Sequence, residues 1–162
     1  MAMSVHFRAT VAQALISEQM LETELGRMDA QDWQPIADLF AAKLPEFDAV
    51  IGLPDADLLA LAVAKARGVP LYHSASSLGQ GGGEVLVMTA QLQGGQPLQT
   101  LAEQIQRAGW TLPLVAAAIE RTNKGARTLL GEMGITVRAV LQVADTPAGL
   151  VFERRTPDRW AS

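Results

Sequence analysis

The spacing of apolar residues along the chain changes near residue 45. Before that point apolar residues recur every three or four positions, as they do on one face of a helix. We expect a brief strand at 5–8 and then a helix over 12–25. A second helix is expected to begin at Asp29 or Asp32, either of which is a suitable N-cap, and to end before Pro45.

After residue 45, short apolar runs alternate with helical patterns. The expected strands are 47–53, 69–72, 84–88, 111–119, 135–143 and an edge strand at 150–153. The expected helices are 58–67, 97–108 and 125–133. Strands that are apolar on both faces and alternate with helices predict a three-layer, doubly wound α/β fold with a mostly parallel sheet. We expect one domain, with a helical N-terminal part (1–45), an α/β core (46–143) and a C-terminal edge strand and tail (144–162).

The loops that leave the carboxyl ends of these strands are the expected place for a ligand. They are 54–57, 74–83, 89–96 and 120–124. Crossovers between parallel strands are right-handed, so all four loops are expected at the same edge of the sheet. Open α/β sheets bind ligands at that edge.

Composition narrows the classes of protein that this chain can be. Its 162 residues are 49% hydrophobic and 19% charged, with a formal net charge of −4, two histidines and no cysteine. The acidic balance argues against a nucleic-acid partner, and the missing cysteines exclude disulfides, thiolate nucleophiles and cysteine-bound metals. Apolar runs are too short to cross a bilayer, and no charged-then-apolar leader is recognisable. We therefore expect a soluble, cytoplasmic protein with no membrane partner.

The segment after the strand at 84–88 carries the clearest candidate chemistry. Gly94 and Gly95 lie just before a helix that is expected to start at Pro97. Glycines let backbone amides approach an anion, and a helix N-terminus favours negative charge. A plain connecting turn explains the same spacing equally well, because glycine pairs are common in such loops.

The surroundings of this loop resemble the type I phosphoribosyltransferases, in particular the orotate and adenine enzymes. In that family a strand ends in two acidic residues and a Thr-Thr-Gly-Gly-Thr-like loop. The loop holds the 5′-phosphate of phosphoribosyl pyrophosphate, and the carboxylates hold the ribose hydroxyls. The resemblance spans residues 30–143 and includes the segments 64–71 and 118–127. It implies the family's fold and a homodimer.

The loop residues depart from the family's pattern. Aligned on the glycine pair, the acidic pair falls on Met88 and Thr89. The degenerate phosphate and ribose loop consists of Met88, Thr89, Ala90, Gln91, Leu92, Gln93, Gly94, Gly95 and Gln96. Losing both carboxylates is expected to weaken sugar binding about a hundredfold to ten-thousandfold. Replacing Met88 and Thr89 by aspartate is then expected to restore part of it.

Two further loops differ from those of the family. The equivalent of the pyrophosphate loop is Pro54, Asp55, Ala56 and Asp57, which has two acids and no arginine. Acids beside a pyrophosphate are unfavourable, and an N-cap role for Asp55 or Asp57 suits them better. The 74–83 loop is short and lacks lysine and arginine, so we expect a flexible linker, and His73 before it is expected to be a loop residue.

Two basic residues remain as candidate ligand contacts. Arg121 and Lys124 follow the strand at 111–119, where an arginine of orotate-type enzymes helps to recognise the base. The alternative is a surface ion pair between Glu120 and Arg121, which contributes little. The basic tail 154–162 is expected to be a solvated terminus, with a clasp on a partner subunit or an anion as the alternative.

Two functions follow. The first is a phosphoribosyltransferase-like protein without standard transferase activity that binds a phosphate, nucleotide or nucleobase, with no cofactor assigned. The alternative is an active, divergent pentosyltransferase of purine or pyrimidine salvage that uses phosphoribosyl pyrophosphate and Mg²⁺. No catalytic residue and no metal ligand is assigned, because no motif of another chemistry occurs in the chain.

Overall fold

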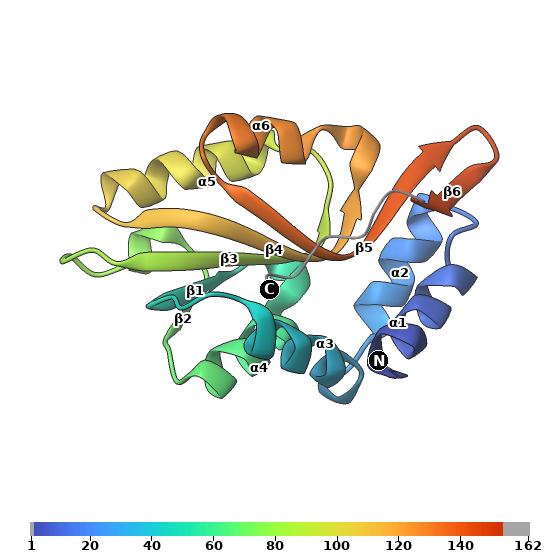
Figure 1. Ribbon diagram of the computed structural model, residues 1–162, viewed down its shortest axis with the longest axis horizontal. Helices are drawn as coiled ribbons and strands as arrows, with labels where there is room; N and C mark the ends of the chain where they lie inside the picture. Colours follow the sequence, from blue (N-terminus) through green and yellow to red (C-terminus); the bar gives the residue numbers. More distant parts are fainter. Residues whose placement is uncertain (1, 154–162) are drawn as a thin grey trace.

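The computed structural model describes residues 2–153 and contains one six-stranded sheet (Figure 1). Its strands are β1 (Ala49–Gly52), β2 (Leu71–Tyr72), β3 (Glu84–Leu92), β4 (Thr111–Arg121), β5 (Thr136–Thr146) and β6 (Gly149–Phe152). The strand order is β2-β1-β3-β4-β5-β6. All neighbouring strands are parallel except β5 and β6, which are antiparallel. The sheet is therefore mostly parallel with an edge strand at its end, as predicted, and the structure shows that this edge strand is antiparallel.

Helices lie on both faces of the sheet. They are α1 (Ala2–Gln13), α2 (Glu18–Arg27), α3 (Ala30–Lys43), α4 (Asp57–Arg67), α5 (Gln96–Arg107) and α6 (Ala126–Glu132). Short 3₁₀ turns are η1 (Pro54–Ala56), η2 (Ala75–Ser77) and η3 (Thr122–Lys124). In Figure 1, α5 and α6 cover one face and α3 and α4 the other, while α1 and α2 lie beside β5 and β6. This confirms the three-layer α/β fold.

Two apolar clusters hold these layers together. One packs the four helices α1, α2, α3 and α4 against the sheet and includes Leu21, Phe40 and Leu86. The other lies under α5 and α6 and includes Ile105 and Leu130. The central strands are buried on both faces, which is why they are continuously apolar in the sequence.

The N-terminal helices differ from the prediction. No strand forms at 5–8, because Phe7 and Val11 are one helical turn apart and are both buried in the core from α1. The Phe7 ring lies 6.0 Å from that of Trp33. The single helix over 12–25 is also wrong, because the chain turns at 14–17 and Ser17 caps α2 by accepting a hydrogen bond from the backbone of Met20. We call α1 and α2 together the helical hood.

The start of α3 is better predicted. Asp29 is the N-cap, and Asp32 completes a reciprocal capping box, with hydrogen bonds of 2.8 and 3.0 Å. The helix ends at Lys43, two residues before Pro45. Both aspartates that the sequence offered as caps are thus used.

The last strand is joined to the hood. The backbone amide of Leu150 on β6 donates a 3.1 Å hydrogen bond to the carbonyl of Leu15, in the turn between α1 and α2. Within residues 2–153, every helix is too short or too polar to cross a membrane. The basic tail 154–162 lies outside the described residues.

Candidate functional site

The strand order places a candidate ligand crevice between β1 and β3. The chain leaves β1 through η1 into α4 on one face and leaves β3 into α5 on the other face (Figure 1). Loops that diverge in this way leave a crevice at the carboxyl ends of the two strands, where doubly wound proteins bind ligands. Asp55 of the loop 54–57 and Gln93 of the loop 93–95 line the same cavity there.

This crevice is bridged by the side chain of Asp55. Its two carboxylate oxygens accept the hydroxyl of Thr89 at 2.9 and 2.8 Å, and Oδ2 also accepts the backbone amide of Gln91 at 3.0 Å. The N-cap role predicted for Asp55 or Asp57 is therefore wrong. Asp57 is the first residue of α4, and Ala56 is its N-cap without a side-chain hydrogen bond.

The two positions that match the family's acidic pair are buried. Met88 is 0% exposed and belongs to the core cluster on the hood side of the sheet. Thr89 is 4% exposed, and its hydroxyl is bound to Asp55. Strand β3 continues to Leu92, so the predicted loop at 89–96 is wrong for its first four residues. These residues pair with β4, which extends the strand.

Packing explains one of the two glycines in this loop. A Cβ atom on Gly95 would lie 2.9 Å from Cδ2 of Leu129 and 3.2 Å from Cα of Ala126. The start of α5 therefore approaches α6 too closely for a side chain. Gly94 has open space around it, and neither glycine has a positive φ.

Arg121 is buried at the end of β4, with 1% of its surface exposed. It donates to Asp145 through Nε at 3.0 Å and also through Nη2, and its Nη1 donates to Glu18 at 3.2 Å and to Oε1 of Gln91 at 2.8 Å. Lys124 adds a 3.4 Å ion pair to Asp145. Arg121 thus joins β3, β4, β5 and the hood.

The pKa of Asp145 reflects this network. Burial raises the pKa of this carboxyl, but hydrogen bonds from Arg121, Asn123 and Lys124 and the charge of Arg121 outweigh it. The pKa of Asp145 therefore lies below its ordinary value, and the carboxylate is the charged partner of Arg121 at neutral pH.

The surface ion pair between Glu120 and Arg121 does not form. Glu120 is buried and instead accepts hydrogen bonds from Arg127, the shortest 2.7 Å, and from Gln142 at 3.1 Å. Strand β4 extends to Arg121, beyond the predicted end at 119, so both residues lie in the sheet rather than in a loop.

The 73–83 segment is divided between the two edges of the sheet. His73 faces Asp57 at 3.5 Å, and both side chains are largely exposed. The second half of the 74–83 loop lies at the opposite edge of the sheet, because the indole of Trp110, just before β4, donates to the carbonyl of Gly79 at 2.7 Å. A Cβ atom on Gly82 would lie 2.7 Å from the carbonyl oxygen of Gly109. Only the beginning of this loop therefore lies at the carboxyl edge.

A cavity of about 370 Å³ lies between the hood and the carboxyl edge. It is lined by Glu22, Leu25, Gly26, Asp55, Ala90, Gln91 and Gln93. Its lining thus carries two carboxylates and two amides but no lysine or arginine. The hood residues were missed by the sequence analysis, because nothing in the sequence shows that α2 folds against the end of β3.

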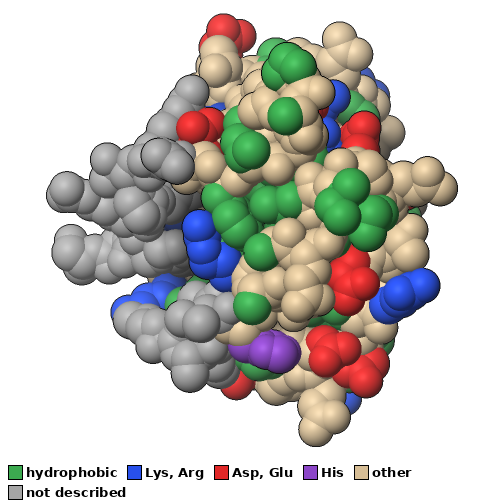
Figure 2. Space-filling model, turned by 90° about the vertical axis from the view of Figure 1, so that its right-hand side faces the viewer, with side chains coloured by type: hydrophobic (Ala, Val, Ile, Leu, Met, Phe, Trp, Pro, Cys, Tyr) green, Lys and Arg blue, Asp and Glu red, His purple; other side chains and the backbone are tan. Residues whose placement is uncertain are grey.

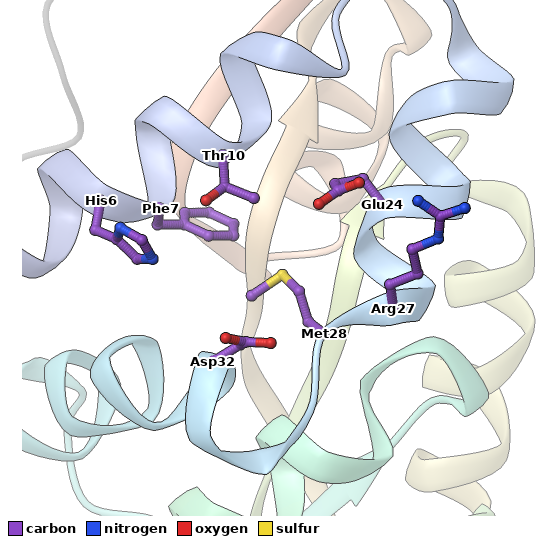
Figure 3. A pocket seen from close by; sticks show the side chains of 7 residues that line it. All are labelled: His6, Phe7, Thr10, Glu24, Arg27, Met28 and Asp32. Carbon is purple, nitrogen blue, oxygen red and sulfur yellow. The ribbon is translucent and has the colours of Figure 1, made fainter.

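A second cavity, of about 160 Å³, lies within the helical part of the protein. Figure 3 shows the side chains that line it, which come from α1, α2, α3 and the link between α2 and α3: His6, Phe7, Thr10, Glu24, Arg27, Met28 and Asp32. Its Asp32 carboxylate is engaged in the capping box of α3. This cavity involves no loop of the sheet, so we place the candidate site in the larger one.

Apolar side chains are exposed on the hood side of the protein. Figure 2 shows hydrophobic side chains gathered in the middle of the face that carries α1, α2 and β6. The exposed large hydrophobic residues include Ile16, Met20 and Val151.

Among residues 2–153, no group of three or more His, Cys, Asp or Glu side chains is placed to hold a metal ion.

Comparison with known proteins identifies the class of fold. No protein-family model matches the chain, and no curated protein matches it by sequence. Solved structures do match. Orotate phosphoribosyltransferase from Mycobacterium tuberculosis, in complex with inorganic phosphate, aligns with a TM-score of 0.69 and 19% identity over 88% of this chain and 96% of that chain.

Two further matches carry the same fold. Adenine phosphoribosyltransferase from Thermoanaerobacter pseudethanolicus aligns with a TM-score of 0.62 and 15% identity, over 74% of this chain and 85% of that chain. UMP synthase from Leishmania donovani aligns with a TM-score of 0.59 and 23% identity over 68% of this chain, which spans only 27% of that enzyme. The chain therefore has the fold of the type I phosphoribosyltransferases. At these identities the likeness shows the fold alone.

Proposed function

We propose that this protein is a phosphoribosyltransferase-like binding protein that lacks the standard transferase reaction and takes a nucleobase-like ligand at the carboxyl edge of its sheet. The observation that carries the proposal is the bridge from Asp55 to Thr89 and Gln91 across the crevice between β1 and β3. A carboxylate in this position repels a pyrophosphate and occupies groups that a sugar phosphate would need.

The residues around the crevice do not fit Mg²⁺ and a sugar diphosphate. Met88 is buried in the core, and Thr89 brings a hydroxyl that is already bound to Asp55. Positions 88 and 89 therefore provide no carboxylate pair for ribose hydroxyls, and the turn 54–57 brings two acids and no cation. Arg121 is neutralised by Asp145 and Glu18 rather than directed at an anion.

The lining of the cavity supports a nucleobase over a phosphate. Glu22 and Asp55 make it acidic, while Leu25 and Ala90 give it an apolar wall. Small-molecule sites combine an apolar lining with a few polar groups that fix orientation. A neutral heterocycle with hydrogen-bond donors suits this combination, and a free phosphate does not.

Calorimetry and a nucleotide-formation assay test the proposal. The protein is titrated with phosphoribosyl pyrophosphate and Mg²⁺, and separately with nucleobases and nucleoside monophosphates. We expect saturable binding of a base, with no binding of the sugar diphosphate and no nucleotide formed. Saturable binding of the sugar diphosphate together with nucleotide formation from any base would overturn the proposal in favour of an active transferase.

We also propose a homodimer, as the resemblance to the family implies. Leu58 and Leu61 on α4 are each 42% exposed and offer apolar surface for a second copy. Light scattering coupled to size exclusion is expected to give twice the monomer mass, and a monomer mass at micromolar concentration would contradict this.

A further inference from the structure

We propose that Arg121 orients the side-chain amide of Gln91 so that this amide and the carboxylate of Asp55 together select a planar heterocycle with a hydrogen-bond donor beside an acceptor on one edge. The amino group and the adjacent ring nitrogen of adenine form such an edge. This inference rests on the proposed function and assigns the residues that determine its specificity.

The orientation of Gln91 follows from the chemistry of its partner. A guanidinium group only donates hydrogen bonds, so the amide atom that lies 2.8 Å from Nη1 of Arg121 must be the oxygen. The amide nitrogen is therefore the end of Gln91 that is left for a ligand, and it can only donate. Gln91 is 8% exposed, and it lines the cavity. A buried amide held in one orientation discriminates between ligands more sharply than an exposed, rotating one.

Asp55 provides an acceptor at the same cavity. Its Oδ2 accepts the backbone amide of Gln91 at 3.0 Å, and both residues line the cavity. A carboxylate has about four acceptor positions, and Asp55 uses its oxygens for Thr89 and Gln91 only. Oδ1 therefore keeps an acceptor position for a ligand donor.

The remaining cavity walls fit a flat ring. Leu25 of α2 and Ala90 of β3 are both buried and apolar, and about 370 Å³ is enough for a two-ring heterocycle. Glu22 and Asp55 disfavour an anionic edge. The best ligand thus donates to Asp55, accepts from Gln91 and carries no negative charge on that edge.

Matched ligands test the selection directly. The bases 9-methyladenine and 9-methylpurine have the same rings and the same blocked N9, but only the first carries the amino donor. By calorimetry we expect 9-methyladenine to bind at least about tenfold more tightly, the effect of one well-placed hydrogen bond. Equal affinities would overturn this inference and leave the proposed function standing, whereas the absence of binding by any base would overturn the proposed function itself.

A nearly isosteric variant tests the role of Gln91. Gln91→Glu keeps an oxygen for Arg121 and replaces the donor by a second acceptor. We expect the affinity for 9-methyladenine to fall by about tenfold or more. The affinity for 9-methylguanine, which presents two neighbouring donors, should rise relative to that for 9-methyladenine. Gln104→Glu makes the same chemical change on the exposed face of α5 and should leave both affinities unchanged. Unchanged base preference in Gln91→Glu would contradict the assignment.

The positioning role of Arg121 has its own measurement. Arg121→Lys removes the planar guanidinium that holds Gln91. We expect the ratio of the affinity for 9-methyladenine to the affinity for 9-methylguanine to fall toward one. A merely structural role would weaken both bases equally and leave the ratio unchanged. If this variant does not fold, Asp145→Asn loosens the guanidinium from its other side and is expected to lower the same ratio. An unchanged ratio in the folded variant would contradict the positioning role.

Discussion

Arg121 on β4 donates a 2.8 Å hydrogen bond to the side chain of Gln91 on β3, although the two residues are 30 positions apart in the sequence. The bond belongs to a polar network that reaches from the buried Arg121 to the half-buried Asp145 and the exposed Glu18. Buried charges are costly unless they are paired, so the network constrains the edge of the sheet as a unit.

Removing Arg121 should destabilise the protein strongly. Arg121→Met is expected to lower the free energy of unfolding by about 3 kcal/mol, because the buried Gln91 and the half-buried Asp145 both lose their partner. Urea denaturation measures this. Arg107→Met is the control, since Arg107 forms only an exposed pair with Glu103 and should change stability by less than about 0.5 kcal/mol. Similar effects of the two variants would contradict the structural account of the network.

Aspartate at position 88 should not restore sugar binding, contrary to the expectation from the sequence. Met88 is fully buried in the core, so Met88→Asp places an unpaired charge there and should cost several kcal/mol, about the range seen for unpaired buried charges. Met88→Leu keeps the volume and should cost less than about 1.5 kcal/mol. A stable Met88→Asp variant that binds phosphoribosyl pyrophosphate would show that position 88 is available to a ligand.

The two glycines after β3 should respond differently to alanine. Gly95→Ala forces a methyl group against Leu129 and the backbone of Ala126 and is expected to destabilise by about 1–3 kcal/mol. Gly94→Ala meets open space and should be neutral or slightly stabilising. Thermal unfolding of both variants distinguishes them. Equal destabilisation would argue against packing as the reason for Gly95.

Low pH should reduce the free energy of unfolding, partly through protonation of Asp145. Its pKa in the folded state lies below that of the unfolded chain, about 3.9, so its contribution is fully present above that value. The contribution is lost as the pH falls from about 4 through the folded pKa. Asp145→Asn should be less stable than the original protein at pH 7, and the difference should shrink toward pH 3. A difference that stays constant with pH would contradict the ion pair.

The sheet could be predicted from the sequence because its central strands are continuously apolar and lie between amphipathic helices. The positions at which β3 and β4 end could not be predicted. Gln91, Glu120 and Arg121 look like loop residues in the sequence, since their burial depends on partners up to 103 positions away. Local polarity marks a strand end only when the polar side chains are solvated, and here they are hydrogen-bonded inside the protein.

Some of the predicted site residues line the candidate cavity, namely Asp55, Ala90, Gln91 and Gln93, but the hood residues that line it were not predicted. Asp55 was expected in the right turn, yet its bond to Thr89 depends on how the ends of β1 and β3 face each other. Glu22 and Leu25 were not expected at the site, because a single helix over 12–25 was predicted and its contact with the sheet edge is not encoded locally. The break at 14–17 has a local signal in Ser17, a favourable N-cap residue, and could have been found.

The hydrogen bond between Leu150 and Leu15 has a consequence for the order in which the protein is assembled. Helices form from local contacts, but the turn that joins α1 to α2 finds this partner only in the last described strand. During synthesis, therefore, α1 and α2 emerge before β6, and the hydrogen bond to Leu15 forms only after residue 150 has been made. A nascent chain can complete β1 to β5 while the turn before α2, a helix that lines the candidate cavity, still lacks this bond.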